Sequence, residues 1–161
     1  MPGSYTFWDL HVAIQDSMGW LDYHLHEFRM KYPRKNKHIL IALPADEDFD
    51  EEKRILDWDA NIEYYFTLEH NRTKHLFRKA KYVYDFGDNW KHSIELEAIL
   101  IREKRIQYPI CIGGKCACPP EDVGGLRGYA SFLEIIKNPL HEEYKETLRW
   151  AGGRFNPEHF N

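Results

Sequence analysis

Apolar residues near the start of the chain recur every three or four positions, at Phe7, Leu10, Ala13, Ile14 and Met18. This spacing predicts an amphipathic helix. Thr6, followed three residues later by Asp9, is a variant of the capping box that begins many helices. Gly19 is a typical left-handed residue at a helix C-terminus. The pattern therefore predicts a helix that begins after Thr6 and ends at Gly19.

From residue 20 onward the hydrophobic period changes to two, which is the period of a strand. Within residues 23–30, the side chains that share one face are His24, His26, Phe28 and Met30. Because Phe28 and Met30 make this face apolar, we expect both histidines to point inward as well. Residues 38–43 are more continuously apolar and predict a second strand, which Pro44 ends.

The middle of the chain gives weaker patterns. Residues 45–61 form an acidic insertion, for which we expect one helical turn around residues 51–58. Residues 62–70 fit either a strand or a helix, and residues 73–80 predict a short helix.

Residues 82–97 predict a β-hairpin whose turn is formed by residues 87–89. On its second arm the side chains of one face are Trp90, His92, Ile94 and Leu96, and the intervening residues are polar. His92 is therefore a third histidine in an inward-facing position.

Two helices are predicted in the last third of the chain. The apolar stripe of the first is Tyr129, Phe132, Leu133 and Ile136, and that of the second is Leu140, Tyr144, Leu148 and Ala151. Strands and helices are mixed without βαβ regularity. We therefore predict an α+β fold, in which a mostly antiparallel sheet carries the N-terminal helix and the two C-terminal helices packed on it. The length predicts a single domain over residues 1–161.

A net charge of −4 does not indicate a general binder of nucleic acids or anionic membranes. Basic segments at residues 31–38 and 72–81 leave a nucleic-acid partner open, although the acidic run at residues 46–59 offsets them. No apolar stretch has the length of a membrane span, so we expect no membrane contact. The odd number of cysteines, all in one loop, is typical of reduced thiols and predicts a cytoplasmic protein.

That loop, residues 111–125, contains all three cysteines, four glycines and two prolines. This composition is incompatible with a regular helix or strand and predicts a shaped loop. Loops of this kind often carry binding or catalytic groups.

Five segments of the chain, taken together, are typical of one family. They are residues 23–28, 84–92, 116–125, 138–141 and 150–157. In this combination the chain resembles the plasmid pRiA4b open-reading-frame-three-like family, whose members are often described as transposon passenger proteins. The resemblance covers almost the whole chain. It implies a protein associated with mobile elements, from a family that is essentially uncharacterised, and it supplies no established catalytic or ligand residues.

Relatives in that family usually begin with a strand and a Lys-Pro-Pro-x-Trp-Arg-Arg-like segment, before the helix that here follows Thr6. The resemblance therefore implies that this sequence lacks the first strand of the family. We expect the sheet to have an unprotected edge, through which copies of the chain would self-associate.

A metal site is one interpretation of the cysteines and the inward-facing histidines, because thiolates and imidazoles are the usual ligands of zinc. The cysteine spacing differs from the paired C-x2-C of strong zinc motifs, so we expect the loop to supply only two ligands. The predicted ligands of zinc or another divalent metal are Cys116, Cys118, His24, His26 and His92. The alternative is that both cysteines are small residues in a tight turn and that each histidine is hydrogen-bonded within the core.

The hairpin turn contains the catalytic candidates Asp85, Asp88 and His92. A carboxylate near an imidazole fixes its tautomer and raises its basicity, as a general base requires. In the alternative, Asp88 accepts hydrogen bonds from backbone N–H groups of a turn with Gly87 at positive φ. We favour this turn role for Asp88, and for His92 both a functional role and packing beside Trp90 remain open.

The predicted binding pocket contains Trp90, Glu121 and Asp122. The Pro-Pro-Glu-Asp sequence is also typical of a helix start, where carboxylates complement free backbone amides, and we favour that interpretation. Lys115 beside Cys116 would lower the pKa of the thiol. A nucleophilic or redox thiol is still less favoured than a metal site, because the spacing is shorter than Cys-x-x-Cys.

The sequence leaves two classes of function open. One is a binding or accessory module with a pocket lined by histidine and cysteine. The other is a metal-assisted hydrolase or related enzyme that uses the strand histidines. The convergence of His24, His26 and His92 would favour the enzyme, and separate packing of the three would favour the module.

Overall fold

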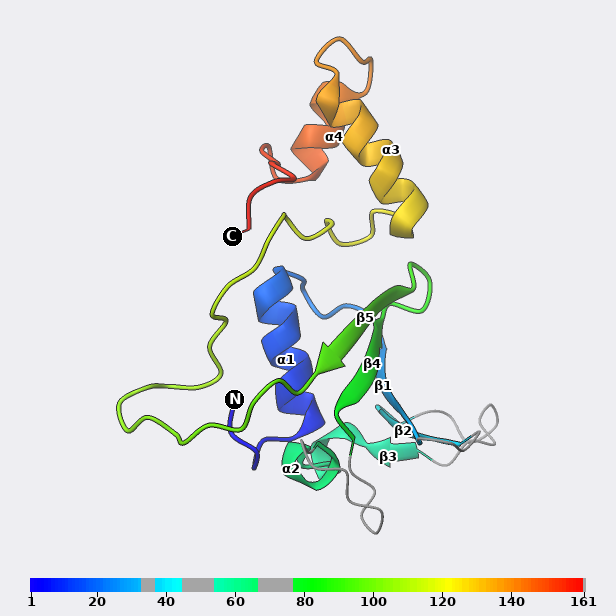
Figure 1. Ribbon diagram of the computed structural model, residues 1–161. Coiled ribbons are helices and arrows are strands. Elements are labelled where there is room, and N and C mark those ends of the chain that lie inside the picture. The colour runs from blue at the N-terminus through cyan, green and yellow to red at the C-terminus, as the bar shows by residue number, and fades with distance from the viewer. Residues whose placement is uncertain (33–36, 45–53, 67–76, 161) are drawn as a thin grey trace.

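A computed structural model describes residues 1–32, 37–44, 54–66 and 77–160 of the chain. A twisted sheet carries the N-terminal helix α1 (Phe7–Met18) on one face, and two C-terminal helices lie beyond one end of the sheet (Figure 1). The predicted α+β class, with a mostly antiparallel sheet, is therefore confirmed. Among the described helices, none has the length and apolar character needed to cross a membrane.

Helix α1 forms as its sequence predicts. Thr6 and Asp9 make the capping box, in which the Thr6 hydroxyl accepts a hydrogen bond from the Asp9 backbone N–H at 3.2 Å. Gly19 ends the helix with a left-handed φ of 71°. Phe7 packs in the core, but so do two polar residues of the same face, His11 and Gln15. The helix therefore places polar side chains as well as apolar ones against the sheet.

The sheet has five strands in the order β3-β2-β1-β4-β5. They are β1 (His26–Lys31), β2 (His38–Ala42), β3 (Arg54–Leu56), β4 (Lys79–Tyr84) and β5 (Trp90–Glu95). All neighbours are antiparallel except β2 and β3, which are parallel. The predicted hairpin is confirmed as β4 and β5, with Tyr82 opposite His92.

The middle of the chain departs from the predicted elements. The helix predicted over residues 73–80 is wrong where the structure describes it, because Lys79 and Ala80 begin β4; residues 73–76 lie outside the described ranges. The turn expected around residues 51–58 is instead the strand β3 followed by a 3-10 turn, η2 (Asp57–Asp59), and residues 51–53 are not described. Residues 62–70 begin with a short helix, α2 (Ile62–Tyr65), and residues 67–70 are not described.

The core between α1 and the sheet is rich in aromatic rings. Phe7, Phe28 and Tyr82 are fully buried, with ring centroids 5.0 Å apart for Phe7 and Phe28 and 4.9 Å apart for Phe28 and Tyr82. Such close edge-on and tilted contacts add to the free energy gained by burying the rings.

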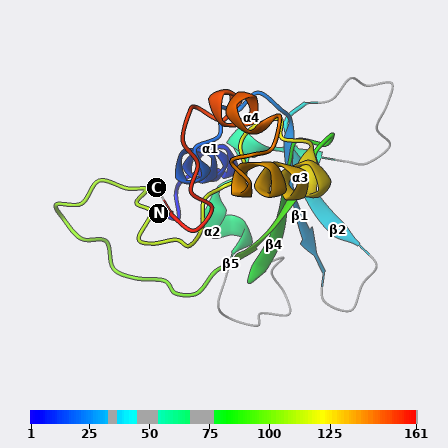
Figure 2. The ribbon, with the colours of Figure 1, turned by 90° about the horizontal axis from the view of Figure 1, so that it is seen from above.

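Helices α3 (Gly125–Lys137) and α4 (Tyr144–Trp150) pack against each other around Phe132. The Phe132 ring contacts Trp150 and Phe155, with centroid distances of 6.0 and 4.9 Å. Figure 2 shows that the two helices lie over the same end of α1 and the sheet. Residues 96–124, which connect β5 to α3, contain no helix or strand.

Candidate functional site

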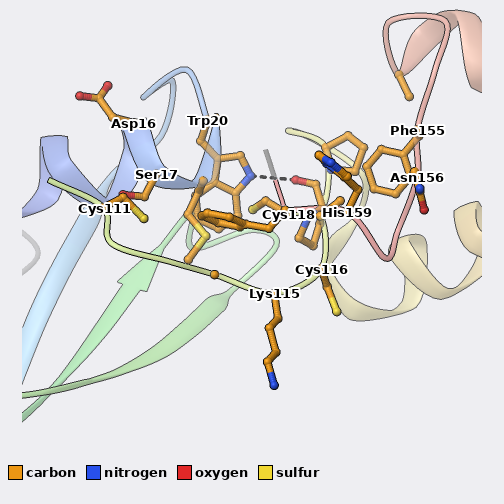
Figure 3. Close-up of a pocket in the computed structure, with 18 of the residues that line it drawn as sticks. Asp16, Ser17, Trp20, Cys111, Lys115, Cys116, Cys118, Phe155, Asn156 and His159 are labelled. Carbon is orange, nitrogen blue, oxygen red and sulfur yellow. Dashed lines mark hydrogen bonds between the residues drawn. The ribbon is translucent and has the colours of Figure 1, made fainter.

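A cavity of about 960 Å³ lies where four segments remote in sequence meet. The end of α1, strand β5, the cysteine loop and the C-terminal tail each contribute part of its wall. Its aromatic and imidazole lining is Trp20, Trp90, His92, Phe155, His159 and Phe160. Figure 3 shows that Lys115 and Cys116 extend away from the other lining side chains. The cavity wall therefore combines these rings with small residues of the cysteine loop and with the charged side chains of Asp16, Lys115 and Arg154.

Specific contacts hold these four segments together. The Trp20 indole N–H donates to the Pro119 carbonyl at 2.9 Å, which fastens the cysteine loop to the end of α1 (Figure 3). The Ala117 N–H donates to the Pro157 carbonyl at 2.9 Å and joins the loop to the tail. Gly114 lies directly under the Phe160 ring, since a Cβ there would be 2.3 Å from the ring. The glycines of this loop therefore allow close packing against the tail as well as turns of the backbone.

His92 is the polar group that β5 places in the wall of this cavity. Its ring lies 5.6 Å from the Trp20 ring and 5.7 Å from the Tyr82 ring, measured between centroids. Its Nε2 atom is buried and has no hydrogen-bond partner among the described residues. Burial lowers the pKa of His92 below its ordinary value of 6.5, so the ring is neutral at pH 7.

This lowered pKa predicts a pH dependence of folding. As the pH falls through about 6.5 the unfolded chain binds a proton at residue 92 more readily than the folded chain, so stability falls until the pH reaches the lowered pKa of the folded state. The slope contributed by this one residue is at most about 1.4 kcal/mol per pH unit. We expect His92→Leu to lose that slope. Urea unfolding of both proteins at pH 7.5, 6.5 and 5.5 measures it, and parallel curves would contradict the prediction.

The three cysteines are free and differ in environment. Cys111 and Cys116 are exposed, and Cys116 has a left-handed φ of 62°. Burial, with a smaller contribution from Glu121, raises the pKa of Cys118 to about 12. A thiolate at Cys118 is therefore strongly disfavoured at neutral pH, which argues against a nucleophilic role for that residue.

We expect thiol labelling to separate these residues. With a chromogenic disulfide reagent at pH 8, two thiols per chain, Cys111 and Cys116, should react rapidly because they are exposed. Cys118 should react only after denaturation, because its thiol is half-buried and protonated. Mass spectrometry of the labelled peptides assigns the sites, and rapid labelling of Cys118 in the native protein would contradict this.

Three of the predicted site residues, His24, Asp85 and Asp122, meet near the hairpin turn. His24 Nε2 lies 2.9 Å from Asp122 Oδ1 and 3.6 Å from Asp85 Oδ2. One potential ligand atom from each of these residues lies within 4.8 Å of the other two. Both aspartates have left-handed backbones, with φ of 53° at Asp85 and 57° at Asp122.

The hairpin turn uses Asp85 rather than Asp88 as its internal acceptor. Asp85 Oδ1 accepts hydrogen bonds from the N–H groups of Gly87 at 2.9 Å and Asp88 at 3.2 Å. Asp88 instead accepts from the Gly124 N–H at 3.0 Å, which docks the start of α3 on the turn. The left-handed positions are Asp85 and Asn89, so the positive φ expected at Gly87 is wrong.

Glu121 and Asp122 do not contact the α3 amides but tie the loop to the N-terminal half of the chain. Glu121 Oε2 accepts from the Leu21 N–H at 2.7 Å, and Glu121 Oε1 accepts from the Tyr84 hydroxyl at 2.5 Å. The Tyr84 ring stacks on Trp20 at 4.9 Å. This network fixes Trp20 in the wall of the cavity.

His26 belongs to a different group, which sequence patterns did not identify. Its ring stacks on His11 with centroids 3.5 Å apart, and one potential ligand atom from each of His11, Asp22 and His26 lies within 4.8 Å of the others. Burial and the nearby His26 lower the pKa of His11, while Asp22 opposes this shift. The position of His11, one turn after Phe7 on the apolar helix face, indicates that its side chain is buried but does not indicate its partner.

The structure thus divides the predicted residues among three places. His92, Trp90, Cys116 and Cys118 line the cavity, His24 joins the two aspartates, and His26 stacks on His11. Within the described ranges, neither group of three potential metal ligands contains a cysteine or His92.

The chain is similar to known proteins in sequence and in structure. The chain is 37% identical over 146 residues to the uncharacterized protein y4hQ of Sinorhizobium fredii (strain NBRC 101917 / NGR234), a match that covers 89% of this chain and 66% of that protein, just under two thirds of its length. The crystal structure of the protein of unknown function MM3350 from Methanosarcina mazei Go1 is similar, with a TM-score of 0.83 and 44% identity, over 100% of this chain and 83% of that one. The model of the plasmid pRiA4b ORF-3-like protein family matches residues 1–161, and the chain belongs to this family.

Proposed function

We propose that the protein is a binding module for a small, planar, uncharged molecule, which the cavity between the cysteine loop, α1, β5 and the tail would enclose. The volume of about 960 Å³ lies at the upper end of the range of small-molecule sites. Such sites combine apolar walls with a few polar groups that fix orientation.

The unpartnered Nε2 atom of His92 is the observation that carries this proposal. A buried polar atom without a hydrogen bond costs about 1–3 kcal/mol, so its retention calls for an explanation. Because the atom is buried, a ligand in the cavity would reach it only if the side chains around His92 shifted, and one hydrogen bond from that ligand would then satisfy it. Because burial keeps the imidazole neutral, it supports a neutral partner better than an anion.

The aromatic lining supports a flat partner. Trp20 and Trp90, with ring centroids 6.0 Å apart, form part of the cavity wall while most of each ring is buried in the core, and Phe155 and Phe160 add half-buried rings. Lys115 and Asp16 are exposed and their side chains are directed away from the other lining groups (Figure 3). We therefore expect affinity to come from apolar contact rather than from ionic attraction.

Titration with N-phenyl-1-naphthylamine tests the proposal, since this probe is neutral, planar and fluorescent in apolar surroundings and carries one N–H donor. We expect saturable binding of one probe per native chain with Kd on the order of 10 µM, equivalent to about 7 kcal/mol. His92→Leu, which keeps a similar side-chain volume, should weaken binding about 5- to 10-fold, as expected for one lost hydrogen bond.

A matched control is His141→Leu, because His141 lies between α3 and α4 and does not line the cavity. That variant should bind like the parent protein. The stability of His92→Leu at pH 7.5 should equal or exceed that of the parent, because an unsatisfied buried atom is removed. Unsaturable fluorescence, or equal affinity in His92→Leu, would count against a binding role for this cavity.

A further inference from the structure

A second site lies apart from the cavity, between α1, the turn before β1 and β1 itself. His11 comes from the buried face of α1, His26 begins β1, and Asp22 lies in the segment that joins the two elements. Both imidazole side chains are completely buried, whereas the Asp22 side chain is 39% exposed. The group is therefore closed toward the core and open to solvent at its carboxylate.

Each histidine has one nitrogen engaged by an outer partner. His26 Nε2 lies 2.8 Å from Asp57 Oδ2, and His11 Nδ1 lies 2.9 Å from the Tyr82 hydroxyl. In metal sites the second nitrogen of a ligating histidine is typically held in this way by a carboxylate or another polar group. The outer partners here, Asp57 and Tyr82, are both fully buried.

The remaining nitrogens are the ones a metal would need. His26 is only 1% exposed, and its Nδ1 atom is buried without a hydrogen-bond partner among the described residues. His11 Nε2 points to Asp22 Oδ1 at 2.8 Å, so the second imidazole and the carboxylate already face each other. His26 is one of three residues whose potential ligand atoms lie within 4.8 Å of one another, and a buried imidazole nitrogen without a partner is difficult to explain by packing alone.

We propose that His11, Asp22 and His26 bind one divalent transition-metal ion, such as Zn²⁺, with Asp57 and Tyr82 as outer-shell partners. Two imidazoles and one carboxylate are a ligand set used by zinc enzymes and by non-haem iron proteins. Such a set leaves further coordination positions open, and solvent reaches the group on the Asp22 side. This site differs from the cavity of the proposed function and does not depend on it.

The stacking of the His11 and His26 rings limits the metal affinity that we expect. The planes of His11 and His26 are only 8° apart, and a metal ion prefers to lie in the plane of each ring that binds it. One ring must therefore turn before both nitrogens can bind well. We expect a Kd on the order of 1 µM rather than the much tighter binding of preformed structural zinc sites.

The experiment uses untagged full-length protein, stripped with a chelator, in a background with Cys111→Ser and Cys116→Ser. These changes remove the exposed thiols that would bind metal adventitiously. Zn²⁺ is titrated by calorimetry, and Co²⁺ is titrated by its visible absorption, which reports coordination directly. We expect one ion per chain.

Asp22→Asn is the decisive variant, because asparagine tolerates the left-handed φ of 57° and still accepts a hydrogen bond from His11. It should fold normally and lose at least about 100-fold in affinity. Asp57→Asn, which alters only the outer shell, should lose about 10- to 100-fold. Thermal melts confirm that each variant is folded.

Asp122→Asn is the matched control, since Asp122 has the same left-handed φ of 57° and also pairs with a histidine, His24. It should leave the Zn²⁺ affinity and the Co²⁺ spectrum unchanged. The proposal is overturned if the parent binds no ion below 1 mM. It is also overturned if Asp22→Asn binds like the parent, or if binding is lost in Asp122→Asn instead.

Discussion

Replacement of Asp57 by alanine is expected to lower the free energy of unfolding by about 3–5 kcal/mol. The Asp57 side chain is completely buried. Its Oδ2 atom holds His26 at 2.8 Å, and its Oδ1 atom accepts from the Trp58 N–H at 2.9 Å. Removing the carboxylate leaves the buried His26 imidazole without its partner and opens a hole beside it, and both effects destabilise the folded state.

Urea unfolding at pH 7.5 in the presence of chelator measures this loss without any contribution from metal. Asp57→Asn should lose clearly less, because the amide oxygen can still accept from a ring N–H. Asp59→Ala, an exposed aspartate of the same turn, should change stability by less than about 0.5 kcal/mol. If Asp57→Ala lost under 1 kcal/mol, the pair with His26 would not be structurally important.

Gly128→Ala is expected to destabilise the protein by about 3 kcal/mol, near the upper end for inserting atoms into packed structure. Gly128 lies in the first turns of α3, where alanine would ordinarily favour the helix by about 1 kcal/mol. A Cβ at this position would, however, be 1.8 Å from the Val123 carbonyl oxygen. Backbone cannot move aside as a side chain can, so the steric clash outweighs the gain in helix propensity.

The same variant should also disturb the junction between α3 and the hairpin turn, because the displaced carbonyl lies next to the Gly124–Asp88 contact. Gly113→Ala provides the control, since it has open space around the added methyl group. Chemical unfolding compares the two free energies. A Gly128→Ala protein as stable as the parent would show that the α3 start is held more loosely than its geometry indicates.

Local sequence patterns were sufficient to predict those elements whose signals lie within a few consecutive residues. The capping box at Thr6 and the two-residue alternation after Trp90 each lie within a short window, and both α1 and β5 follow them. Strand β3 has only three residues and exists because it pairs in parallel with β2. Such a strand is stabilised by a distant partner, so its own sequence does not predict it.

The candidate sites likewise depend on contacts between residues that are distant in sequence, which local patterns do not predict. Strand alternation correctly placed His26 inward, but β1 begins at that residue, so His24 is not held by the strand and joins Asp122 instead. His92 is inward-facing as predicted and lines the cavity. His11 was missed because its position on a helix face gives no indication that it will stack on a strand residue 15 positions later. Hydrophobic periodicity predicts which side chains share one face of a helix or strand. A site also depends on which faces pack against each other, and this is set by the tertiary structure.

The connection over residues 96–124 has a consequence for local stability. It contains no regular structure, and α3 with α4 is joined to the rest of the molecule largely through contacts such as Trp20 with Pro119 and Gly124 with Asp88. Units attached in this way open without global unfolding and behave as separate cooperative segments in hydrogen exchange. Amide protons of α3 and α4 would then exchange before those of the central strands. Because the tail that follows α4 forms part of the cavity wall, the same opening motion would admit a ligand and release it.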